Sequence, residues 1–384
     1  MYGFVRGQSV PLIAIVSVER VFGGAERSLL TLAKGLSGSA MVKYVLVCPA
    51  RCEWDDELRL HGVIARTFCG CPNKSGGSVL YRIGFVCRLL WMGLGVFRLV
   101  NALRPNVLHA NGLKAVLACV LVGIVLRIPC VWHVRDFPRR PMLVRLACEY
   151  CAAIICPTAF ILQSVSELSG ANSRKLHMVY NPVVPAYGIA PATTSLSLTG
   201  GTVNFLMIAQ IVPWKRIDLF IAAAAVLRLR YPHARFYHIG KDLSGRNSRY
   251  AACLEGQVRQ MGLKEAFKFL GNIPNAQSAL DNFDALVLPS EREPFGRVVV
   301  EAWLAGKPVV VSDCGGPAEL VTHGMNGLVF TSGNSAELAA SMEELLQDAA
   351  LRERLGAAGK AKAPQFSAGN HTRDICRVYE RLLA

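Results

Sequence analysis

Short hydrophobic runs alternate with longer helical patterns in the first half of the chain. The runs are rich in Val and Ile and predict strands at 12–18, 43–48, 107–109, 129–133, 153–156 and 177–179. Helical patterns fall between them, notably at 25–36, 78–103 and 113–127. Nearly continuous hydrophobic strands that alternate with helices are typical of a parallel sheet covered on both faces. This half therefore predicts a doubly wound α/β domain.

The pattern stops at a proline-rich and polar stretch and then begins again. Pro182, Pro185 and Pro191 precede a polar run at 193–201, which is the composition of a linker. Beyond it, strands are predicted at 203–208, 235–239, 267–270, 285–288 and 308–311. Helices are predicted at 216–230, 247–262, 297–305, 335–347, 350–360 and 371–383.

We therefore expect an N-terminal Rossmann-like domain (1–183), a linker (184–202) and a C-terminal domain (203–370). A last helix (371–384) is expected to pack back toward the N-terminal domain. The fold class is α/β, with two doubly wound parallel sheets facing a central cleft. Ligands of such sheets bind at the carboxyl ends of the strands.

The composition agrees with this picture and excludes several classes of protein. Of the 384 residues, 52% are hydrophobic and 18% are charged, whereas an average globular chain has about 25% charged residues. Disorder, collagen and coiled coil are therefore excluded, and the length favours two domains.

The net charge of +15 is concentrated in the first half of the chain. Between Leu58 and Arg135 no residue is acidic and ten are basic. A basic surface attracts anionic lipid, nucleic acid or a phosphorylated substrate. The sequence has no helix-turn-helix, RNA-recognition or zinc pattern, so we expect no nucleic-acid partner.

The thirteen cysteines indicate neither disulfides nor metal. Their number is odd and most lie in apolar runs, as buried thiols do in a reducing cytoplasm. Cys148 and Cys151 have C-x-x-C spacing but lack a second ligand pair. The longest apolar run, 115–126, is too short for a spanning helix, which needs about 20 residues. A helix lying on a membrane surface remains open.

The segment 284–330 contains the clearest chemistry. The strand at 285–288 ends in a polar loop, and a helix begins near Phe295 and Gly296. Free N–H groups at a helix start suit a phosphate or a sugar hydroxyl. Glu301 could accept two adjacent ribose hydroxyls, or it could be a surface residue of the first helical turn. Glu293 could face a sugar, or it could be a solvated loop charge.

These residues carry a family resemblance. The E-x7-E pair Glu293/Glu301 in EPFGRVVVEAWLAGKPVV, with the following GGPAE and NGLVF, resembles retaining glycosyltransferase family 4, whose fold is GT-B. Further fragments follow in family order over nearly the whole chain: VFGGAERSLLTLAKGL, VLHANGLKA, CVWHVRDF, VYNPV, IAQIVPWKRID, HIGKD and FLGNIPNA.

The resemblance implies retaining transfer from a UDP- or GDP-linked sugar held by the C-terminal domain. It implies that Glu301 binds the ribose and that Glu293 contacts the transferred sugar. Lys215 would face the leaving diphosphate, where negative charge develops. The Arg that the family places near this Lys is replaced here by Gln210. Other implied contacts are the backbone at Phe295, Gly296, Arg297 and Gly24 and, as a substitute cation, Arg216, which could equally be a solvated residue at a helix start.

In the N-terminal domain, the resemblance implies that His133 orients a hydroxyl near the reacting sugar. His109 and Arg135 are weaker candidates for residues that contact the acceptor. The alternatives are core or rim histidines and a surface arginine. The family generally works without a catalytic metal, and we expect no metal and no cofactor besides the substrates.

The acceptor is expected to be a glycan or a lipid-linked molecule bound by the N-terminal domain. The acid-free stretch holds Phe85, Trp91 and Phe97 in its central helix, which suggests a membrane-held acceptor. A buried helix with snorkelling Arg stems would explain the same pattern. The expected setting is bacterial surface polysaccharide or lipopolysaccharide synthesis, in the cytoplasm or on the inner membrane face.

Two rival interpretations remain beside the nucleic-acid one. A dehydrogenase or epimerase needs G-x-G-x-x-G after its first strand, and the turn Phe22-Gly23-Gly24-Ala25-Glu26 does not fit. A catalytically inactive relative that binds a membrane or a partner is left open by Gln210, although the retained Glu293/Glu301 pair argues against it.

Overall fold

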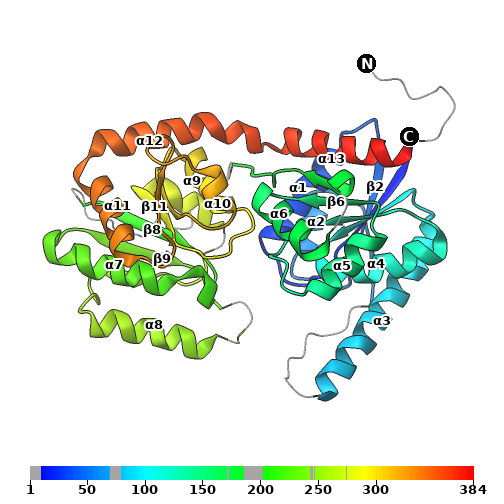
Figure 1. Ribbon diagram of the computed structural model, residues 1–384, viewed down its shortest axis with the longest axis horizontal. Coiled ribbons are helices and arrows are strands. Elements are labelled where there is room, and N and C mark those ends of the chain that lie inside the picture. The colour runs from blue at the N-terminus through cyan, green and yellow to red at the C-terminus, as the bar shows by residue number, and fades with distance from the viewer. Residues whose placement is uncertain are drawn as a thin grey trace. The chain divides into compact units, whose positions relative to one another are not determined.

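The computed structural model describes residues 10–69, 79–170, 173–185, 202–242, 245, 247–273 and 275–384. The side chains of residues 79–90 are not among those described. Most of the predicted linker and the side chain of Phe85 therefore lie outside the described residues. The chain forms two compact units (Figure 1). Unit 1 contains Met1–Pro182 together with Ala368–Ala384, and unit 2 contains Val183–Ser367.

Unit 1 is built on a seven-stranded sheet in which every neighbouring pair is parallel. The strand order is β3-β2-β1-β4-β5-β6-β7. The order thus reverses between β1 and β4, which is the topological switch point of a doubly wound fold. The strands are β1 (Leu12–Val16), β2 (Lys43–Pro49), β3 (Ala65–Phe68), β4 (Val107–Asn111), β5 (Cys130–His133), β6 (Ala153–Cys156) and β7 (Leu176–Met178).

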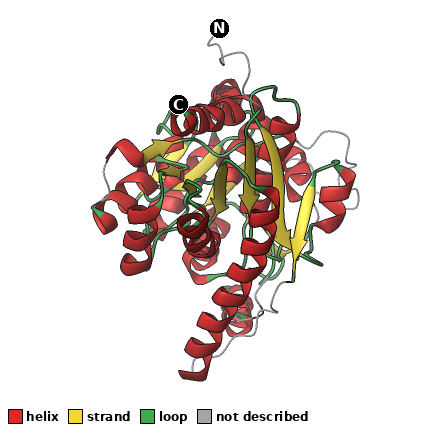
Figure 2. Cartoon of the chain, turned by 90° about the vertical axis from the view of Figure 1, so that its right-hand side faces the viewer, coloured by secondary structure: helices red, strands yellow, loops and turns green. Residues whose placement is uncertain are grey.

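Helices cover both faces of this sheet (Figure 2). One apolar core joins the sheet to α3 (Val79–Leu103), α4 (Leu113–Leu126), α5 (Pro141–Tyr150) and α6 (Ala159–Ser169). A second core on the other face joins it to α1 (Gly24–Ser37), α2 (Asp55–Leu60) and α13 (Ala368–Leu383). The last helix of the chain therefore packs within unit 1, where it lies against α1.

Unit 2 repeats the architecture with six parallel strands in the order β10-β9-β8-β11-β12-β13. Its switch point lies between β8 and β11. The strands are β8 (Asn204–Ile208), β9 (Arg235–Ile239), β10 (Phe267–Phe269), β11 (Ala285–Leu288), β12 (Val309–Ser312) and β13 (Leu328–Phe330). The helices are α7 (Ile217–Arg230), α8 (Ser248–Gln260), α9 (Arg297–Leu304), α10 (Gly316–Leu320), α11 (Ser335–Gln347) and α12 (Ala349–Lys362).

Short 3-10 turns complete the connections: η1 (Ser173–Lys175), η2 (Pro213–Lys215), η3 (Ala276–Asn282) and η4 (Ala363–Phe366). The core of unit 2 joins α7, α8, α11 and α12 to one face of the sheet. Two doubly wound parallel sheets confirm the α/β class that the sequence predicts.

The hydrophobic pattern did not single out β3 and β13. In β3, Arg66 and Thr67 are exposed, because the strand lies at the edge of the sheet and has few apolar neighbours to cover. β13 has three residues and also lies at an edge. Edge strands need less hydrophobic sequence than central ones, so the periodicity signal is weak there.

A buried polar cluster joins the sheet of unit 1 to its last helix. His109 Nε2 lies 3.2 Å from His133 Nδ1, and the Tyr379 hydroxyl lies 2.7 Å from His109 Nδ1. His371 stacks on His133 with ring centres 5.8 Å apart, and its Nδ1 lies 2.7 Å from the Tyr180 carbonyl oxygen. Burial and the nearby Arg135 lower the pKa of His109 to about 3 and hold that of His133 well below its usual range.

The buried, neutral histidines should therefore make unit 1 less stable as the pH falls. Because His109 stays neutral in the folded state, the unfolded state binds the extra proton as the pH falls below about 6.5. Stability is then complete above about pH 6.5, and His109 alone accounts for a loss of about 2 kcal/mol by about pH 5. Urea unfolding across this range measures the loss, and His109→Gln should flatten the pH dependence. An equally steep dependence in His109→Gln would contradict the assignment, and the exposed His233→Gln is the matched control.

Candidate active site

The loops at the switch point of unit 2 carry most of the predicted site residues. Gln210, Lys215 and Arg216 follow β8, and Glu293 lies in the loop after β11. β8 and β11 are neighbours and parallel, so their carboxyl ends meet at the same edge of the sheet. The fold thus brings together side chains that are nearly eighty residues apart.

Lys215 and Glu293 form an ion pair between these two loops. The Lys215 ammonium donates to Glu293 Oε2, and the two side chains are only 12% and 15% exposed. The same ammonium lies 4.4 Å from the centre of the Trp214 ring. Backbone bonding reinforces the connection, because the Glu291 N–H donates to the Trp214 carbonyl oxygen over 3.0 Å. The pair therefore places one cation and one carboxylate side by side at the sheet edge.

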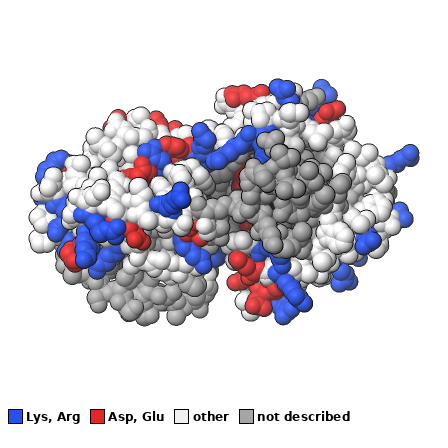
Figure 3. Space-filling model, turned by 90° about the horizontal axis from the view of Figure 1, so that it is seen from below, with Lys and Arg blue, Asp and Glu red and all other residues white. Residues whose placement is uncertain are grey.

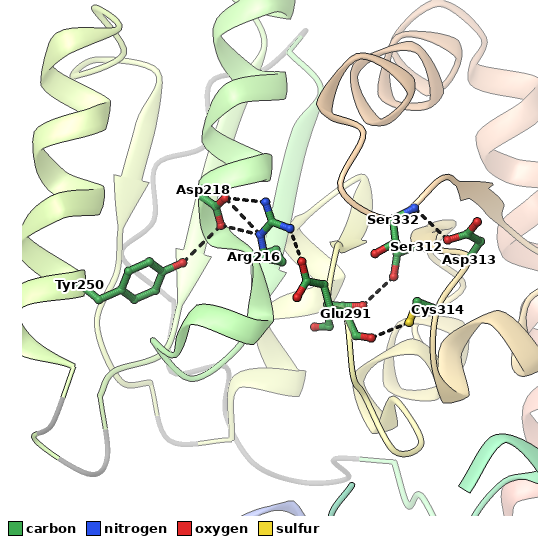
Figure 4. Close-up of polar contacts among 9 residues, drawn as sticks. Arg216, Asp218, Tyr250, Glu291, Ser312, Asp313, Cys314 and Ser332 are labelled. Carbon is green, nitrogen blue, oxygen red and sulfur yellow. Dashed lines mark hydrogen bonds and ion pairs between the residues drawn. The ribbon is translucent and has the colours of Figure 1, made fainter. Parts of the chain in front are cut away.

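Arg216 joins the same two loops through a second set of ion pairs (Figure 4). Its guanidinium donates to both carboxylate oxygens of Asp218 at 2.9–3.2 Å and to Glu291 Oε1. The Tyr250 hydroxyl donates to Asp218 Oδ1 over 3.3 Å. We call Arg216, Asp218 and Glu291 the arginine clamp. Arg216, expected as a substitute phosphate ligand, is thus engaged by two carboxylates.

The backbone of Arg216 is itself unusual. Its φ of 54° lies in the left-handed region, where a side chain with a Cβ is strained and glycine is favoured. Arg216 caps the start of α7, immediately after the turn that holds Lys215. The arginine clamp therefore fixes a strained turn at the position where Lys215 meets Glu293.

Glycines allow close backbone packing around the Glu293 loop. Gly296 has a φ of 89° and precedes α9, and a Cβ there would lie 2.8 Å from Pro317. A Cβ on Gly315, whose φ is 82°, would lie 2.7 Å from the Glu293 carbonyl oxygen. The Gly316 N–H donates to that same oxygen over 2.7 Å. The turn before α10 thus holds the Glu293 loop through its backbone.

The start of α9 contributes backbone groups and the carboxylate of Glu301 to the candidate site. Phe295 is buried, with its ring 5.7 Å from that of Phe366, so its side chain serves the core. Arg297 and Glu301 are paired one helical turn apart, with Nη2 and Oε1 3.5 Å from each other. The sequence interpretation did not name this pairing, which the i,i+4 spacing could have suggested.

Polar residues that the sequence interpretation did not place at the site also lie around the two loops of unit 2. Glu291 and Asp218 complete the arginine clamp, and Tyr250, from α8, donates to Asp218. Ser312 Oγ donates to the Ser290 carbonyl oxygen over 2.6 Å, which ties β12 to the loop after β11. Asp218 lies two residues after Arg216, so their pairing could have been suggested from the sequence. Tyr250 and Glu291 come close to Arg216 and Asp218 only through the fold. Gln210 is exposed in the loop after β8.

Unit 1 contains a pocket of about 250 Å³ at its own switch point. It is lined by residues that follow β1, β4 and β5, among them Glu26, Asn111, Lys114, Trp132 and Arg135. The Arg135 guanidinium donates to the side-chain oxygens of Asn111 (2.5 Å) and Asn181 (2.6 Å). The indole N–H of Trp132 is buried with no hydrogen-bond partner among the described residues. Such a group is compatible with a ligand that accepts a hydrogen bond.

The glycine turn before α1 lies beside this pocket. Gly23 caps the helix and Gly24 is its exposed first residue, one position before the predicted start at 25. Glu26 Oε2 accepts from the Gly23 N–H over 3.1 Å. Burial raises the pKa of Glu26 to about 7, so this carboxyl titrates near neutrality.

His109 and His133 lie in the buried cluster described above, with fully buried side chains. His133 Nε2 has no hydrogen-bond partner among the described residues. Arg135, two residues after His133, lines the pocket of unit 1.

The described part of the chain contains neither a candidate metal cluster nor a membrane-spanning helix. No three His, Cys, Asp or Glu side chains gather there in a way that could hold a metal ion. None of the described helices combines the length and hydropathy needed to cross a bilayer. On the face shown in Figure 3, coloured Lys and Arg atoms lie scattered among uncharged residues rather than in one stripe.

Comparison with known families identifies the chain. Residues 195–362 match the family model of glycosyl transferases group 1, and residues 22–187 match that of glycosyltransferase family 4. Together the two models span both units. The protein belongs to the family 4, group 1 glycosyltransferases, as its motifs predict.

Two curated relatives and one solved structure illustrate the likeness. The lipopolysaccharide core biosynthesis glycosyltransferase LpsD of Rhizobium meliloti is 41% identical over 28% of this chain and 31% of its own length. A D-inositol 3-phosphate glycosyltransferase of Jonesia denitrificans is 27% identical over 61% of this chain and 58% of its own. The matches thus span about a third to three fifths of these relatives. Anabaena HepE, solved with UDP-glucose, has a TM-score of 0.82 at 23% identity, covering 97% of this chain and all of HepE, and shows the shared fold.

Replacement of Arg216 separates backbone strain from ion pairing. Arg216→Ala loses the partly exposed ion pairs, worth ~0–1 kcal/mol each, and keeps the left-handed strain. Arg216→Gly loses the same pairs but relieves that strain. We therefore expect Arg216→Gly to be more stable than Arg216→Ala by about 1 kcal/mol in urea unfolding. An alanine variant as stable as the glycine variant would show that the turn is not strained.

Proposed function

We propose that the protein is a glycosyltransferase that moves a sugar from a UDP- or GDP-linked donor to a hydroxyl of a glycan or lipid-linked acceptor, with retention of configuration. The observation that carries the proposal is the Lys215–Glu293 pair beside the glycine-bounded start of α9, at the switch point of unit 2. Family membership supports it, as do the names of LpsD and of the HepE complex with UDP-glucose.

The leaving nucleoside diphosphate needs fixed positive charge. Lys215 supplies one cation whose ammonium is already held at the sheet edge. The N–H groups at and just before the start of α9, at Phe295, Gly296 and Arg297, add the partial positive charge of a helix start, about half a unit. With Gln210 in place of a second cation, and Arg216 held by Asp218 and Glu291, this helix end takes a larger share of the diphosphate charge.

Glu301 is proposed to accept the two ribose hydroxyls of the nucleotide. Its side chain is 13% exposed and is paired with Arg297 through one oxygen at 3.5 Å, a long contact that a hydroxyl can supplement. A carboxylate offers acceptor sites on both oxygens, so ribose and Arg297 can be bound together. Arg297 then keeps Glu301 ionised and oriented.

Glu293 is proposed to bind hydroxyls of the transferred sugar. Its Oε2 accepts from Lys215, and its backbone oxygen accepts from Gly316, so the carboxylate is oriented on both sides. In front-face transfer the acceptor oxygen bonds to the anomeric carbon as the phosphate oxygen leaves. The acceptor proton passes to that departing phosphate oxygen. The step balances without a protein nucleophile, and Glu293 acts by orientation.

The acceptor is proposed to bind unit 1, where the pocket at the switch point carries Lys114, Arg135 and the unpartnered Trp132 N–H. His133 is proposed to use its unpartnered Nε2 for a sugar hydroxyl, with His109 and Tyr379 behind it. Gly24 would bring the backbone close to the phosphates. We propose that no metal or further cofactor takes part, and EDTA-treated enzyme is expected to keep its activity.

The proposed setting is bacterial surface polysaccharide or lipopolysaccharide synthesis, in the cytoplasm and peripherally on the inner membrane face. The second candidate is a catalytically inactive relative that binds a membrane or a partner. It is favoured by one observation, the neutral Gln210 where the family resemblance implies an Arg.

Nucleotide binding tests the donor site. A nucleotide at ~100 times its dissociation constant should add about 2.7 kcal/mol of stability to the wild type. Glu301→Ala removes hydrogen bonds to a charged acceptor and should weaken binding by about 2 kcal/mol, roughly thirtyfold. Thermal unfolding with UDP, GDP and ADP measures both effects.

One control variant accompanies this experiment. Glu353→Ala changes an exposed glutamate on α12 and should leave binding unchanged. Unchanged nucleotide affinity in Glu301→Ala would remove the ribose assignment. If none of the three nucleotides stabilises the wild type, the inactive relative becomes the better description.

Glu293 should separate binding from turnover. Glu293→Gln keeps the shape and the hydrogen-bond acceptor oxygen but loses the charge that pairs with Lys215. We expect donor turnover to fall about a hundredfold while nucleotide affinity changes less than about threefold. Radiolabelled sugar transfer and thermal shift measure the two quantities. Equal losses in both would assign Glu293 to nucleotide binding instead.

A further inference from the structure

The outer side of α4 is hydrophobic although it faces solvent. Leu121, Ile124 and Val125 are 57%, 53% and 68% exposed and fall on one side of the helix. The opposite side, with Ala115 and Cys119, is buried in the core. A helix that is hydrophobic all round is normally covered on both sides, either by protein or by lipid.

The neighbouring helix α5 repeats the pattern. Met142, Leu146 and Tyr150 are exposed at intervals of four residues, and Met142 is 83% exposed. α4 packs beside α5 on one side and beside α3 on the other. These helices cover the same face of the sheet of unit 1, so their outer sides look the same way. We call the following six residues the docking face: Leu121, Ile124, Val125, Met142, Leu146 and Tyr150.

Basic residues surround the docking face. Lys114 and Arg127 lie at the two ends of α4 and are exposed. Arg139 and Arg140, just before α5, and Arg145, in the middle of α5, are exposed as well. Glu149 is the one acidic residue of α4 and α5, and Glu19 pairs with Lys114 over 2.8 Å. Cations around an apolar centre match an anionic bilayer, which offers phosphates at the surface and hydrocarbon beneath.

The charge pattern also decides between occupants. A second copy of this chain seated on the docking face would bring the same arginines toward one another, and like charges oppose such contact. A nucleic acid would match the cations but would leave the apolar centre unpaired. An anionic lipid surface satisfies both parts of the pattern.

We propose that the docking face and its basic border bind the surface of an anionic membrane. Lys114, Leu117, Arg139 and Arg140 line or border the pocket of unit 1 and also adjoin the docking face. Docking there holds the pocket at the level of the lipid headgroups. This part rests on the proposed function and makes the acceptor a lipid-linked molecule that enters the pocket from the headgroup layer.

Vesicle flotation of the full chain tests the proposal. The vesicles contain phosphatidylcholine with roughly a third phosphatidylglycerol, or phosphatidylcholine alone. Wild type should float with the anionic vesicles and lose binding as salt rises from ~0.1 M to ~0.5 M. Leu121→Glu combined with Val125→Glu should bind about tenfold more weakly, because two carboxylates replace exposed apolar groups facing the lipid.

The matched control is Leu229→Glu combined with Met325→Glu, at exposed positions of unit 2. It should float like wild type. The proposal is overturned if the docking-face variant floats like wild type, or if wild type binds neutral and anionic vesicles equally. It is also overturned if sedimentation shows a wild-type dimer that the docking-face variant dissociates.

The experiment needs no catalysis, so its result is separate from that on the proposed function. Nucleotide stabilisation should be the same in wild type and in the docking-face variant. Loss of flotation with nucleotide binding intact supports both proposals. Docking without any nucleotide binding keeps the membrane inference and rejects the transferase. The variants should unfold at the wild-type temperature, since the substituted side chains are exposed.

Discussion

The ion pair between Lys215 and Glu293 is the contact on which the candidate site depends. Both side chains are largely removed from water, so either charge without its partner would cost folding free energy. Breaking a pair of this kind leaves one uncompensated charge at the sheet edge. The surrounding structure fixes both partners: the Glu293 loop is held by the Gly316 N–H, and the Lys215 turn is held by the arginine clamp. The pair is thus pre-oriented before any ligand arrives, and pre-orientation is what electrostatic catalysis requires.

The arginine clamp shows how tertiary structure can redefine a residue. By charge alone, Arg216 is a plausible phosphate ligand. In the fold its guanidinium meets two carboxylates, and its backbone sits in a conformation that favours glycine. The cost of that conformation is offset where the side chain ties α7 to the loop after β11. Arg216 is therefore a positioning residue for the Lys215 turn.

The two units use one principle for different tasks. Each has its polar loops at the point where the strand order reverses, because only there do the loops diverge and leave space between them. In unit 2 this space is bordered by an ion pair and a helix start. In unit 1 it is a pocket that adjoins the outer side of α4 and α5. The difference lies in the helices that flank each point: α9 is short and is preceded by Gly296, whereas α4 is hydrophobic on all sides apart from Lys114 in its first turn.

The sequence by itself determined the order of the elements and the family. The strands 153–156 and 285–288 agree with the structure residue for residue, because buried parallel strands require uninterrupted apolar runs. The E-x7-E spacing and the glycine turns identified the family because they are local in the chain. The edge strand β3 was missed, since its Arg66 and Thr67 are exposed, whereas the edge strands β7 and β10 were predicted.

Only the tertiary structure decided which charges meet. Glu291 and Tyr250 reach the arginine clamp from distant segments, so no local spacing could reveal them. The burial of His109 and His133 depends on α13, which returns from the far end of the chain to cover them. The exposed outer side of α4 could not be predicted from the sequence either. Beyond Lys114 the helix is apolar on every side, so its hydrophobic pattern does not distinguish the buried side from the solvent-exposed side.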